Sequence, residues 1–394
     1  MKTAILLLLL LALVVTGCQV NSNPPSGDDP SPEEDRRIAE LSLPQKVGQL
    51  LYIGLAQNDM DLNQDILSEL QPGGLILFSR NFTTLEQTVV MLNSYRQNED
   101  LAWPLFVGTD QEGGAVSRLP SAWATTFPTA RLVGEQADQA KDLAVAMGSE
   151  LAALGLNMNF APVLDVHSNP KNPVIGNRAF GSTPEDVWVA GQQVIAGLSS
   201  QGMIPVVKHF PGHGDTSTDS HLELPLVAAD RKLLEDRELW PFWEAVQAEV
   251  PAVMVGHLLV PALDAEHPAS LSQAVITGLL RDQWGYQGLV VTDDLEMGAI
   301  AQDNIGEAAV QAVLAGADML LVCHSYDKQV AVRDALLEAV QQGRISEARI
   351  DQSLQRILQL KDQYRVHKQP VDLEQASQVV GSPGHRDLVD SLGK

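Results

Sequence analysis

The chain has 394 residues, enough for one large domain or two small ones, and 45% of them are hydrophobic, which suffices for a sizeable core. Its 26 basic and 50 acidic side chains give a formal net charge of -24. A nucleic acid is a polyanion that this charge would repel, so the composition argues against a nucleic-acid-binding function.

The first twenty residues indicate an exported protein. They read MKTAILLLLLLALVVTGCQV, one lysine followed by a long apolar stretch. This stretch is too short to span a bilayer comfortably and is typical of a secretory signal. Its end, from Val15 to Cys18, resembles a bacterial lipobox, which predicts a lipoprotein signal peptide over residues 1–17 and lipidation of Cys18. An ordinary cleaved signal with an incidental cysteine is the alternative.

Residues 18–35 predict a disordered tether, because the segment after Cys18 is rich in Pro, Ser, Asp and Asn and almost free of apolar residues. We therefore expect a protein that is anchored to a membrane by its lipid and not embedded in it. Gln19 stands where an aspartate would indicate inner-membrane retention in similar Gram-negative lipoproteins, so we expect the outer membrane, facing the periplasm. Cys323 is the only other cysteine, which leaves no structural disulfide once Cys18 carries lipid.

Eight short apolar runs follow in chain order, each succeeded by a longer stretch with helical character. Their apolar residues are nearly continuous and do not alternate with polar ones, which is typical of a parallel sheet buried on both faces. The predicted strands span residues 50–55, 74–78, 104–110, 158–166, 204–210, 252–259, 288–295 and 319–323.

The stretches between these runs predict helices. Residues 137–155 and 185–202 carry apolar side chains at helical spacing and each end in a glycine, a common helix C-cap. Eight strands that alternate with helices predict an α/β fold, a single (β/α)8 barrel of the TIM type over residues 36–366. A doubly wound open sheet is the alternative. We expect closing helices over residues 327–366 and, over residues 367–394, a C-terminal tail too short for another domain.

Polar and reactive side chains stand where the predicted strands end, and no other feature of the sequence supports the barrel as strongly. In (β/α)8 enzymes the active site is built at the carboxyl ends of the strands. The third to eighth strands end at Asp110, Asp165, Lys208 and His209, His257, Asp293 and Asp294, and His324. We therefore expect the functional site at this end of the barrel.

The loop KHFPGHGDTSTDSHLELP, residues 208–225, gathers three histidines into a short segment. Two of them are four residues apart, a spacing that places two metal ligands on one helix face. Pro211 and the neighbouring glycines disfavour a helix, so we expect no metal site. Asp219 and His221 lie two residues apart, and a carboxylate beside an imidazole would orient the ring and raise its basicity. The pair is a candidate catalytic histidine with its aspartate; a solvated surface pair is the alternative.

The segment VVTDDLEM, residues 290–297, places two adjacent carboxylates at the mouth of the predicted barrel. Such a pair is either a nucleophile with a structural neighbour or a helix N-cap with a dipole partner. Asp294 precedes LEMGAI and is a candidate N-cap. Asp293, the last residue of its strand, would then point into the site.

Four long motifs in this order resemble those of family 3 glycoside hydrolases. They are DQEGG at 110–114 with Arg118, NPVIGNRAFG at 172–181, KHFPGHGDTSTDSHLELP at 208–225 and VVTDDLEM at 290–297. The resemblance covers nearly all of the chain between residues 38 and 366. Within the third motif, the sequence DSH at 219–221 resembles that of the β-N-acetylglucosaminidase (β-N-acetylhexosaminidase) branch, which includes enzymes of bacterial cell-wall recycling.

The resemblance implies the chemistry of the site. Asp293 matches the family's nucleophile, which forms a covalent glycosyl-enzyme intermediate, and His221, held by Asp219, matches the acid/base of this branch. The positions that match hydrogen-bonding partners of the terminal sugar are Asp110, Arg118, Arg178, Lys208 and His209. The implied activity is retaining, exo-acting hydrolysis of terminal β-linked N-acetylglucosamine from peptidoglycan- or chitin-derived saccharides. No cofactor is implied, because carboxylate, imidazole and water suffice.

A histidine acid/base departs from the two carboxylates usual in retaining enzymes. An imidazole titrates near neutral pH without the burial that a glutamic acid needs, so it can protonate the leaving oxygen and later deprotonate water. We expect its loop to move, and hence that substituting Gly212 or Gly214 slows turnover more than it weakens binding.

Two departures from the family pattern leave the preferred leaving group open, because Ala115 stands where many relatives have Arg and His167 where Asn is common.

The alternatives in the same family are a β-glucosidase and a β-N-acetylglucosaminide phosphorylase. We expect no second α/β domain of the kind that supplies the acid/base in many β-glucosidases. A neutral histidine does not repel phosphate, so release of a sugar 1-phosphate would identify the phosphorylase. A non-catalytic carbohydrate-binding lipoprotein is the alternative from another class.

Overall fold

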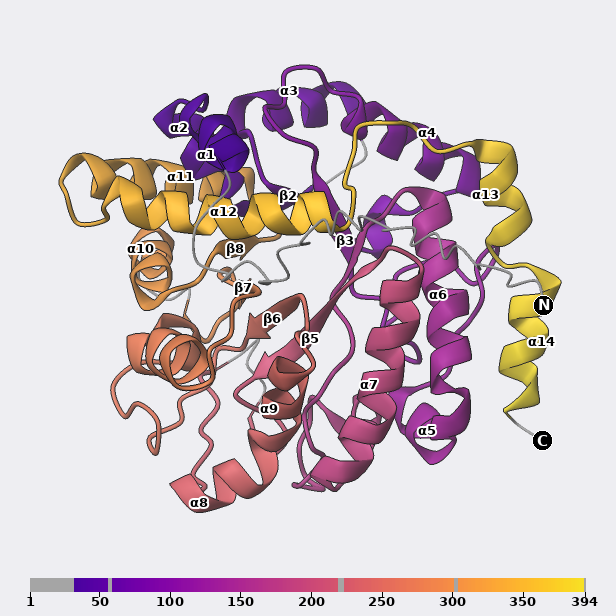
Figure 1. The fold of residues 1–394 in the computed structure, drawn as a ribbon. Coiled ribbons are helices and arrows are strands. Elements are labelled where there is room, and N and C mark those ends of the chain that lie inside the picture. The colour runs from indigo at the N-terminus through magenta and orange to yellow at the C-terminus, as the bar shows by residue number, and fades with distance from the viewer. Residues whose placement is uncertain (1–31, 56–58, 219–222, 301–303, 393–394) are drawn as a thin grey trace, which may run out of the picture.

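The computed structural model describes residues 32–55, 59–218, 223–300 and 304–392, and within them eight parallel strands close into a barrel (Figure 1). Each strand pairs with its neighbour in sequence, and β1 closes the ring against β8. The strands are β1 Leu51–Gly54, β2 Gly74–Leu77, β3 Phe106–Thr109, β4 Met158–Asn159, β5 Ile204–Phe210, β6 Ala252–Val255, β7 Leu289–Asp294 and β8 Met319–Val322. The predicted (β/α)8 barrel is confirmed, and the closure excludes an open sheet.

The fourth strand is much shorter than the sequence predicts. The predicted strand runs to residue 166, but β4 ends at Asn159, and Pro162 beyond it has no N–H to give to a ladder. The chain nevertheless stays beside β5, because Val163 bridges to Lys208 and the Leu164 amide donates to the Lys208 carbonyl at 2.7 Å. This irregular stretch carries Asp165 over the end of β5.

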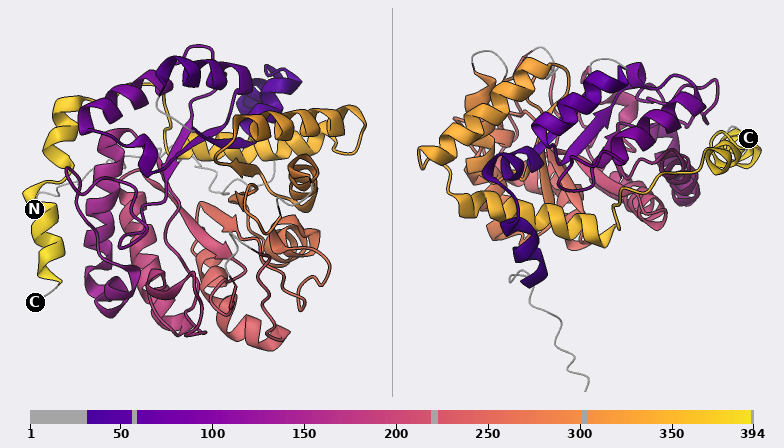
Figure 2. Two further views of the ribbon diagram at one scale, coloured as in Figure 1. Left: turned by 180° about the vertical axis from the view of Figure 1, so that it is seen from behind. Right: turned by 90° about the horizontal axis from the view of Figure 1, so that it is seen from above.

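Helices surround the barrel (Figures 1 and 2). The α-helices are α1 Pro32–Ala39, α2 Leu43–Gln49, α3 Met60–Leu70, α4 Leu85–Arg96, α5 Ala130–Glu135, α6 Ala140–Leu154, α7 Pro184–Ser200, α8 Arg231–Leu233, α9 Trp240–Gln247, α10 Ile305–Ala315, α11 Tyr326–Gln341, α12 Glu347–Gln363, α13 Leu373–Val379 and α14 Pro383–Ser391. Segments Leu234–Glu238 and Ala274–Gln283 are π-helical, and single 3-10 turns lie at Ser79–Asn81, Ala137–Gln139, Gly176–Arg178 and Ala269–Leu271.

The residues after α12 fold back onto the outer layer of the barrel. Helix α13 contacts α4 and α6, and α14 contacts α6 (Figure 2). The contact is specific, because the buried carboxylate of Glu150 on α6 accepts hydrogen bonds from the Gly381 amide and from His385, both at 2.9 Å.

The predicted signal peptide, Cys18 and residues 18–31 of the predicted tether lie outside the described residues. The tether prediction is wrong for residues 32–35, which form the first turn of α1. Glu33, Glu34 and Asp35 stand in that turn, where negative charge is favourable at a helix N-terminus. No helix of the described chain has the length and apolar character needed to cross a bilayer.

A buried lysine ties α12 to the amino-terminal end of the barrel. Lys361 Nζ donates to the carbonyls of Gly73 and Pro104, which precede β2 and β3, at 3.1 and 2.5 Å. Its third acceptor is Gln49 Oε1, at 3.3 Å, so all three acceptors are neutral. Burial lowers the pKa of Lys361 to about 7.

The free energy of unfolding should therefore rise with pH between about 7 and about 9, because the unfolded chain, with a lysine pKa near 10.4, binds this proton more tightly. Lys361→Met should remove this component, which amounts to at most about 1.4 kcal/mol per pH unit. Urea unfolding of both proteins at several pH values measures it, with the exposed Lys232→Met as control. A difference between wild type and Lys361→Met that stays constant with pH would contradict the prediction.

Candidate active site

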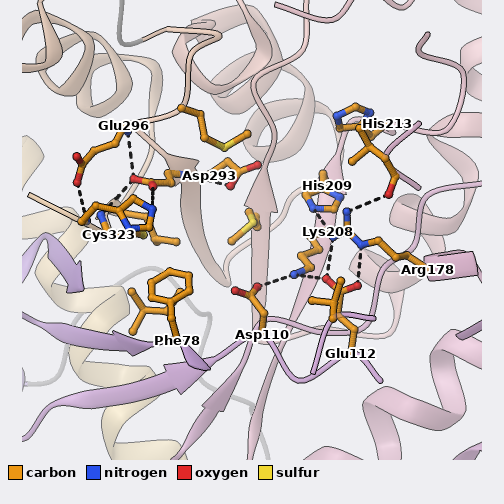
Figure 3. Close-up of a pocket in the computed structure, with 18 of the residues that line it drawn as sticks. Phe78, Asp110, Glu112, Arg178, Lys208, His209, His213, Asp293, Glu296 and Cys323 are labelled. Carbon is orange, nitrogen blue, oxygen red and sulfur yellow. Dashed lines mark hydrogen bonds and ion pairs between the residues drawn. The ribbon is translucent and has the colours of Figure 1, made fainter. Parts of the chain in front are cut away.

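A cavity of about 320 Å³ opens at the carboxyl ends of the strands, where the sequence places the site. In Figure 3 one side of it carries Glu112, Arg178, Lys208 and His209, and the other carries Phe78, Glu296 and Cys323. The predicted site residues that line the cavity are Asp110, Arg118, Arg178, Lys208, His209 and Asp293. Asp219 and His221 lie outside the described residues.

A buried network of ion pairs forms the first wall. Lys208 Nζ lies 2.7 Å from Asp110 Oδ1 and 2.7 Å from Glu112 Oε1. Arg178 donates from Nε and Nη2 to the two oxygens of Glu112, both at 2.8 Å. Sequence reasoning assigned no role to Glu112, although it lies inside DQEGG just two residues after Asp110. The feature of the sequence that could have identified Glu112 was its position close to Asp110, a carboxylate at the end of a predicted strand.

Charged neighbours in this network hold Glu112, Lys208 and Arg178 in their charged forms. Burial alone would raise the pKa of Glu112, but Lys208 and Arg178 hold it well below its usual range. Burial alone would lower the pKa of Lys208, but Asp110 and Glu112 raise it, and Glu112 does the same for the pKa of Arg178. Charged, prealigned donors and acceptors of this kind suit the hydroxyl groups of a sugar.

Two glycines turn the chain so that Glu112 points inward. Gly113 and Gly114 have φ angles of 98° and 57°, which residues with a side chain rarely adopt. A Cβ at Gly113 would lie 2.1 Å from the Pro128 carbonyl oxygen, so the position has no room for one. The EGG sequence therefore fixes the turn that aims Glu112 at Lys208.

A buried aspartate sets the orientation of His209. Asp165 Oδ2 lies 2.7 Å from His209 Nδ1, and its Oδ1 accepts hydrogen bonds from the backbone amides of His209 and His213 at 3.2 and 2.7 Å. Burial would raise the pKa of Asp165, but the two histidines lower it. A carboxylate at Nδ1 keeps a proton on that nitrogen. The other ring nitrogen, Nε2, lies 3.4 Å from Arg178 Nη2. The sequence marked Asp165 only as a strand end.

Asp293 is the second-last residue of β7, and its side chain lies in the cavity (Figure 3). Its Oδ1 accepts a hydrogen bond from the Asp294 amide at 2.8 Å. Burial alone would raise the pKa of Asp293, but His257, His209 and Lys208 contribute to lowering it. The carboxylate is therefore ionised at neutral pH and available to an electrophilic carbon.

Asp294 is not a helix N-cap, so that prediction is wrong. Residues 295–300 form turns, and α10 begins at Ile305 with Asn304 as its cap. Asp294 Oδ1 instead accepts hydrogen bonds from the amides of Cys323 and Glu296, at 3.2 and 3.1 Å. The Asp294 carboxylate thus accepts a hydrogen bond from the Cys323 amide, just beyond the end of β8, and links β7 to that strand.

The two histidines that are four residues apart are held by different partners. The rings of His209 and His213 meet edge to face, with centroids 5.8 Å apart. Nδ1 of His213 lies 2.8 Å from Thr216 Oγ1, while Nδ1 of His209 lies against Asp165. The described part of the chain contains no group of His, Cys, Asp and Glu side chains that could hold a metal ion.

Hydrogen bonds and close packing hold the start of the histidine-rich loop in place, so its glycines are required by the packing and do not serve only as points of flexibility. Asn172 Nδ2 donates to the carbonyls of His213 and Gly214 at 2.8 and 3.0 Å. A Cβ at Gly214 would lie 1.6 Å from the Val166 carbonyl oxygen, and one at Gly212 would lie 2.8 Å from a side-chain carbon of a neighbouring helix. Substitution at either glycine would displace this stretch and not merely stiffen it, so the effect expected from the sequence would not report on loop motion.

Known proteins resemble this chain over most of its length. Beta-hexosaminidase A of Pseudoalteromonas piscicida is 33% identical over 93% of the chain, which spans 63% of that protein's length. Beta-hexosaminidase LpqI of Mycobacterium tuberculosis is 36% identical over 82% of the chain and 84% of its own length. The solved structure of a glycoside hydrolase family 3 β-N-acetylglucosaminidase from Paenibacillus sp. FPU-7 matches with a TM-score of 0.85 and 45% identity, over 89% of the chain and 68% of that protein.

The family itself follows from the sequence match. The model of the glycosyl hydrolase family 3 N-terminal domain matches residues 42–360, which include all eight strands and every described residue of the cavity. The chain therefore belongs to glycosyl hydrolase family 3.

Proposed function

We propose that this protein is a retaining, exo-acting β-N-acetylhexosaminidase that removes terminal β-linked N-acetylglucosamine from peptidoglycan- or chitin-derived saccharides. The observation that carries the proposal is the ionised Asp293 in a cavity with a wall of prealigned charged groups. The names of the similar proteins support the choice of N-acetylglucosamine as the terminal sugar.

The proposed reaction has two displacements at the anomeric carbon. A carboxylate oxygen of Asp293 bonds to that carbon while the bond to the leaving oxygen breaks, and His221 gives the leaving oxygen a proton. A water molecule, deprotonated by His221, then attacks the same carbon and releases Asp293. Asp219 would orient the imidazole of His221 for both steps. The result is hydrolysis with retained configuration.

The charged wall would hold the terminal sugar during both steps. Asp110 would accept hydrogen bonds from hydroxyl groups, and Lys208 and the guanidinium groups of Arg118 and Arg178 would donate to them. His209 would use Nε2, because Nδ1 is engaged by Asp165. Since Glu112 already fixes the two cations, little reorganisation is needed when the sugar binds.

The test compares 4-nitrophenyl N-acetyl-β-glucosaminide with the matching β-glucoside, using purified protein that begins at Gln19. We expect kcat/KM to favour the N-acetyl sugar by at least about 100-fold, which corresponds to ~2.8 kcal/mol of transition-state discrimination. Equal or reversed preference would contradict the proposed specificity, and no activity on either would favour a binding protein. Formation of a sugar 1-phosphate in phosphate buffer would instead identify a phosphorylase.

We also propose that Cys18 carries lipid and anchors the protein to the outer membrane, facing the periplasm. The geometry of the barrel is compatible with catalysis in the anchored state, because α1 contacts α12, and α12 meets the amino-terminal ends of β2 and β3. Helix α1, at the start of the described chain, therefore lies toward the end of the barrel away from the cavity. Labelled palmitate should enter the wild type and not Cys18→Ala; labelling of both would contradict the assignment.

A further inference from the structure

A second cavity, of about 490 Å³, opens at the amino-terminal end of the barrel. Part of its lining comes from the segments 246–251 and 284–289, which lead into β6 and β7. Helix α12 contributes Arg356, Gln359 and Gln363. None of these residues lines the active site, so this amino-terminal cavity is a separate feature of the molecule.

Arg356 belongs to a cluster of three arginines around one buried carboxylate. Arg356 Nη1 and Arg281 Nη2 lie 3.0 and 2.6 Å from the two oxygens of Asp318, whose side chain is fully buried. Arg349 reaches the same carboxylate through Ser353, which accepts from Arg349 Nη1 at 2.7 Å and donates to Asp318 Oδ1 at 2.9 Å. Within the described parts of the chain, no other carboxylate pairs with these arginines, so three guanidinium groups and one carboxylate leave an excess of two positive charges.

This excess of positive charge is unfavourable at a largely buried place. Burial lowers the pKa of Arg281, and repulsion by Arg356 adds to that effect while Asp318 opposes it. Burial also lowers the pKa of Arg349, and both other arginines contribute. Buried charges in proteins are normally paired, so an anion bound beside Arg356 would relieve the repulsion.

Arg356 also has the donors that such an anion needs. Its side chain is 23% exposed in the cavity, and its Nε and Nη2 have no hydrogen-bond partner among the described residues. Gln359 and Gln363, one and two turns further along α12, add side-chain amides, and Gln359 has only a long contact of 3.5 Å with Glu34. A guanidinium fork beside amide donors suits the oxygens of a phosphate group.

Glu249 gives the amino-terminal cavity a negative charge as well. Its side chain is exposed, and it is the one acidic residue among the described residues that line the cavity. Glu249 would repel a simple anion and attract a cation. The cavity therefore complements a ligand with a phosphate group at one end and an ammonium group at the other.

The start of the described chain lies beside this cavity. Glu34 of α1 contacts Gln359, and Arg37 of α1 pairs with Asp362 of α12 at 2.8 Å. Residues 19–31 separate α1 from Cys18, the proposed site of lipid attachment, and a chain of that length spans at most about 45 Å. A membrane that holds the lipid is thus within reach of the cavity. The net charge of -24 disfavours a strongly anionic surface, whereas a zwitterionic one does not repel the protein.

We propose that the amino-terminal cavity binds the headgroup of a zwitterionic phospholipid, with the phosphate at Arg356 and the ammonium group at Glu249. The proposal goes beyond the proposed activity, and it rests on the proposed lipid anchor for the source of the headgroup. A barrel bound in this way has its amino-terminal end at the membrane and its active site directed away from it.

The first experiment measures the affinity for two soluble ligands, glycerophosphoethanolamine and inorganic phosphate, by isothermal titration calorimetry. It uses protein that begins at Gln19, which retains every described residue. Arg356→Gln should weaken binding of both ligands at least about tenfold, because it removes the charged donor. Arg344→Gln is the matched control, since Arg344 pairs with Glu307 outside the cavity, and it should change neither affinity.

Glu249→Gln separates a zwitterion from a simple anion. The variant loses an attraction for the ammonium group, so glycerophosphoethanolamine should bind about threefold more weakly. It also loses a repulsion of the phosphate group, so inorganic phosphate should bind about threefold more tightly. Glu249 is exposed, so this variant decides the question even if Arg356→Gln fails to fold.

A second experiment identifies the source of the phosphate group. Vesicles of phosphatidylethanolamine and phosphatidylcholine are compared in flotation with vesicles of digalactosyldiacylglycerol, a neutral lipid without phosphate. Wild type and Arg344→Gln should float with the phospholipid vesicles only, and Arg356→Gln with neither.

Three results would overturn headgroup binding. They are an unchanged affinity in folded Arg356→Gln, a shift of both soluble ligands in the same direction in Glu249→Gln, and binding of inorganic phosphate without flotation on phospholipid vesicles. Arg356→Gln should keep kcat/KM on the chromogenic N-acetylglucosaminide within about twofold of wild type, because the cavity is separate from the active site. Absence of hydrolysis by the wild type would overturn the proposed function and not the headgroup site.

Discussion

Asp293→Asn should lower kcat on 4-nitrophenyl N-acetyl-β-glucosaminide by at least about 10⁴-fold, because the amide cannot form the glycosyl-enzyme bond. The Asp294 amide can still donate to the carbonyl oxygen of the new carboxamide side chain, so the fold of β7 should survive. Steady-state kinetics measure the loss, and circular dichroism confirms the fold. Asp282→Asn, an exposed position on the segment Ala274–Gln283, serves as the matched control.

A direct test of the same residue traps the intermediate. A 5-fluoro-N-acetylglucosaminyl fluoride reacts at the first displacement but hydrolyses slowly, so it should label the peptide that contains Asp293 with one sugar. Mass spectrometry of the digested protein locates the label. A label on any other carboxylate, or full activity of the Asp293 variant, would rule out Asp293 as the nucleophile.

Glu112→Gln should lower kcat/KM about 100-fold, the second-largest effect expected from a single substitution here. The substitution preserves shape but leaves Lys208 and Arg178 with one charged partner fewer at buried positions, which is costly. Because Glu112 helps to keep the pKa of Lys208 high, the alkaline limb of the pH profile of kcat/KM should move to lower pH.

The shift of the alkaline limb distinguishes a positioning role from a general loss of stability, which would scale activity equally at every pH. Glu135→Gln, exposed on α5, should change neither quantity. A folded Glu112→Gln protein with wild-type kcat/KM and an unchanged pH profile would contradict the role assigned to Glu112.

The site residues differ in how far sequence reasoning could reach them. Asp110, Lys208 and Asp293 were predicted, because each ends a recognisable apolar strand and parallel strands in a barrel bring their carboxyl ends together. Sequence reasoning assigned no role to Glu112 or Asp165, because the residues to which they hydrogen-bond belong to other parts of the barrel. Asp165, for example, acts on His209 and His213 through an irregular extension of β4 that the strand pattern does not predict.

The sequence by itself determined the alternation of eight apolar strands with helices, the end of the barrel that bears the site, and the motifs that place the chain in its family. Those features are local, since burial pattern and glycine turns depend on neighbouring residues. Only the tertiary structure decided the pairing of charges. Lys208 meets Asp110 across 98 positions of the chain, and His324 meets Phe78 at the closure of the barrel. Such contacts depend on which strands become neighbours, and that arrangement exists only after the barrel has closed.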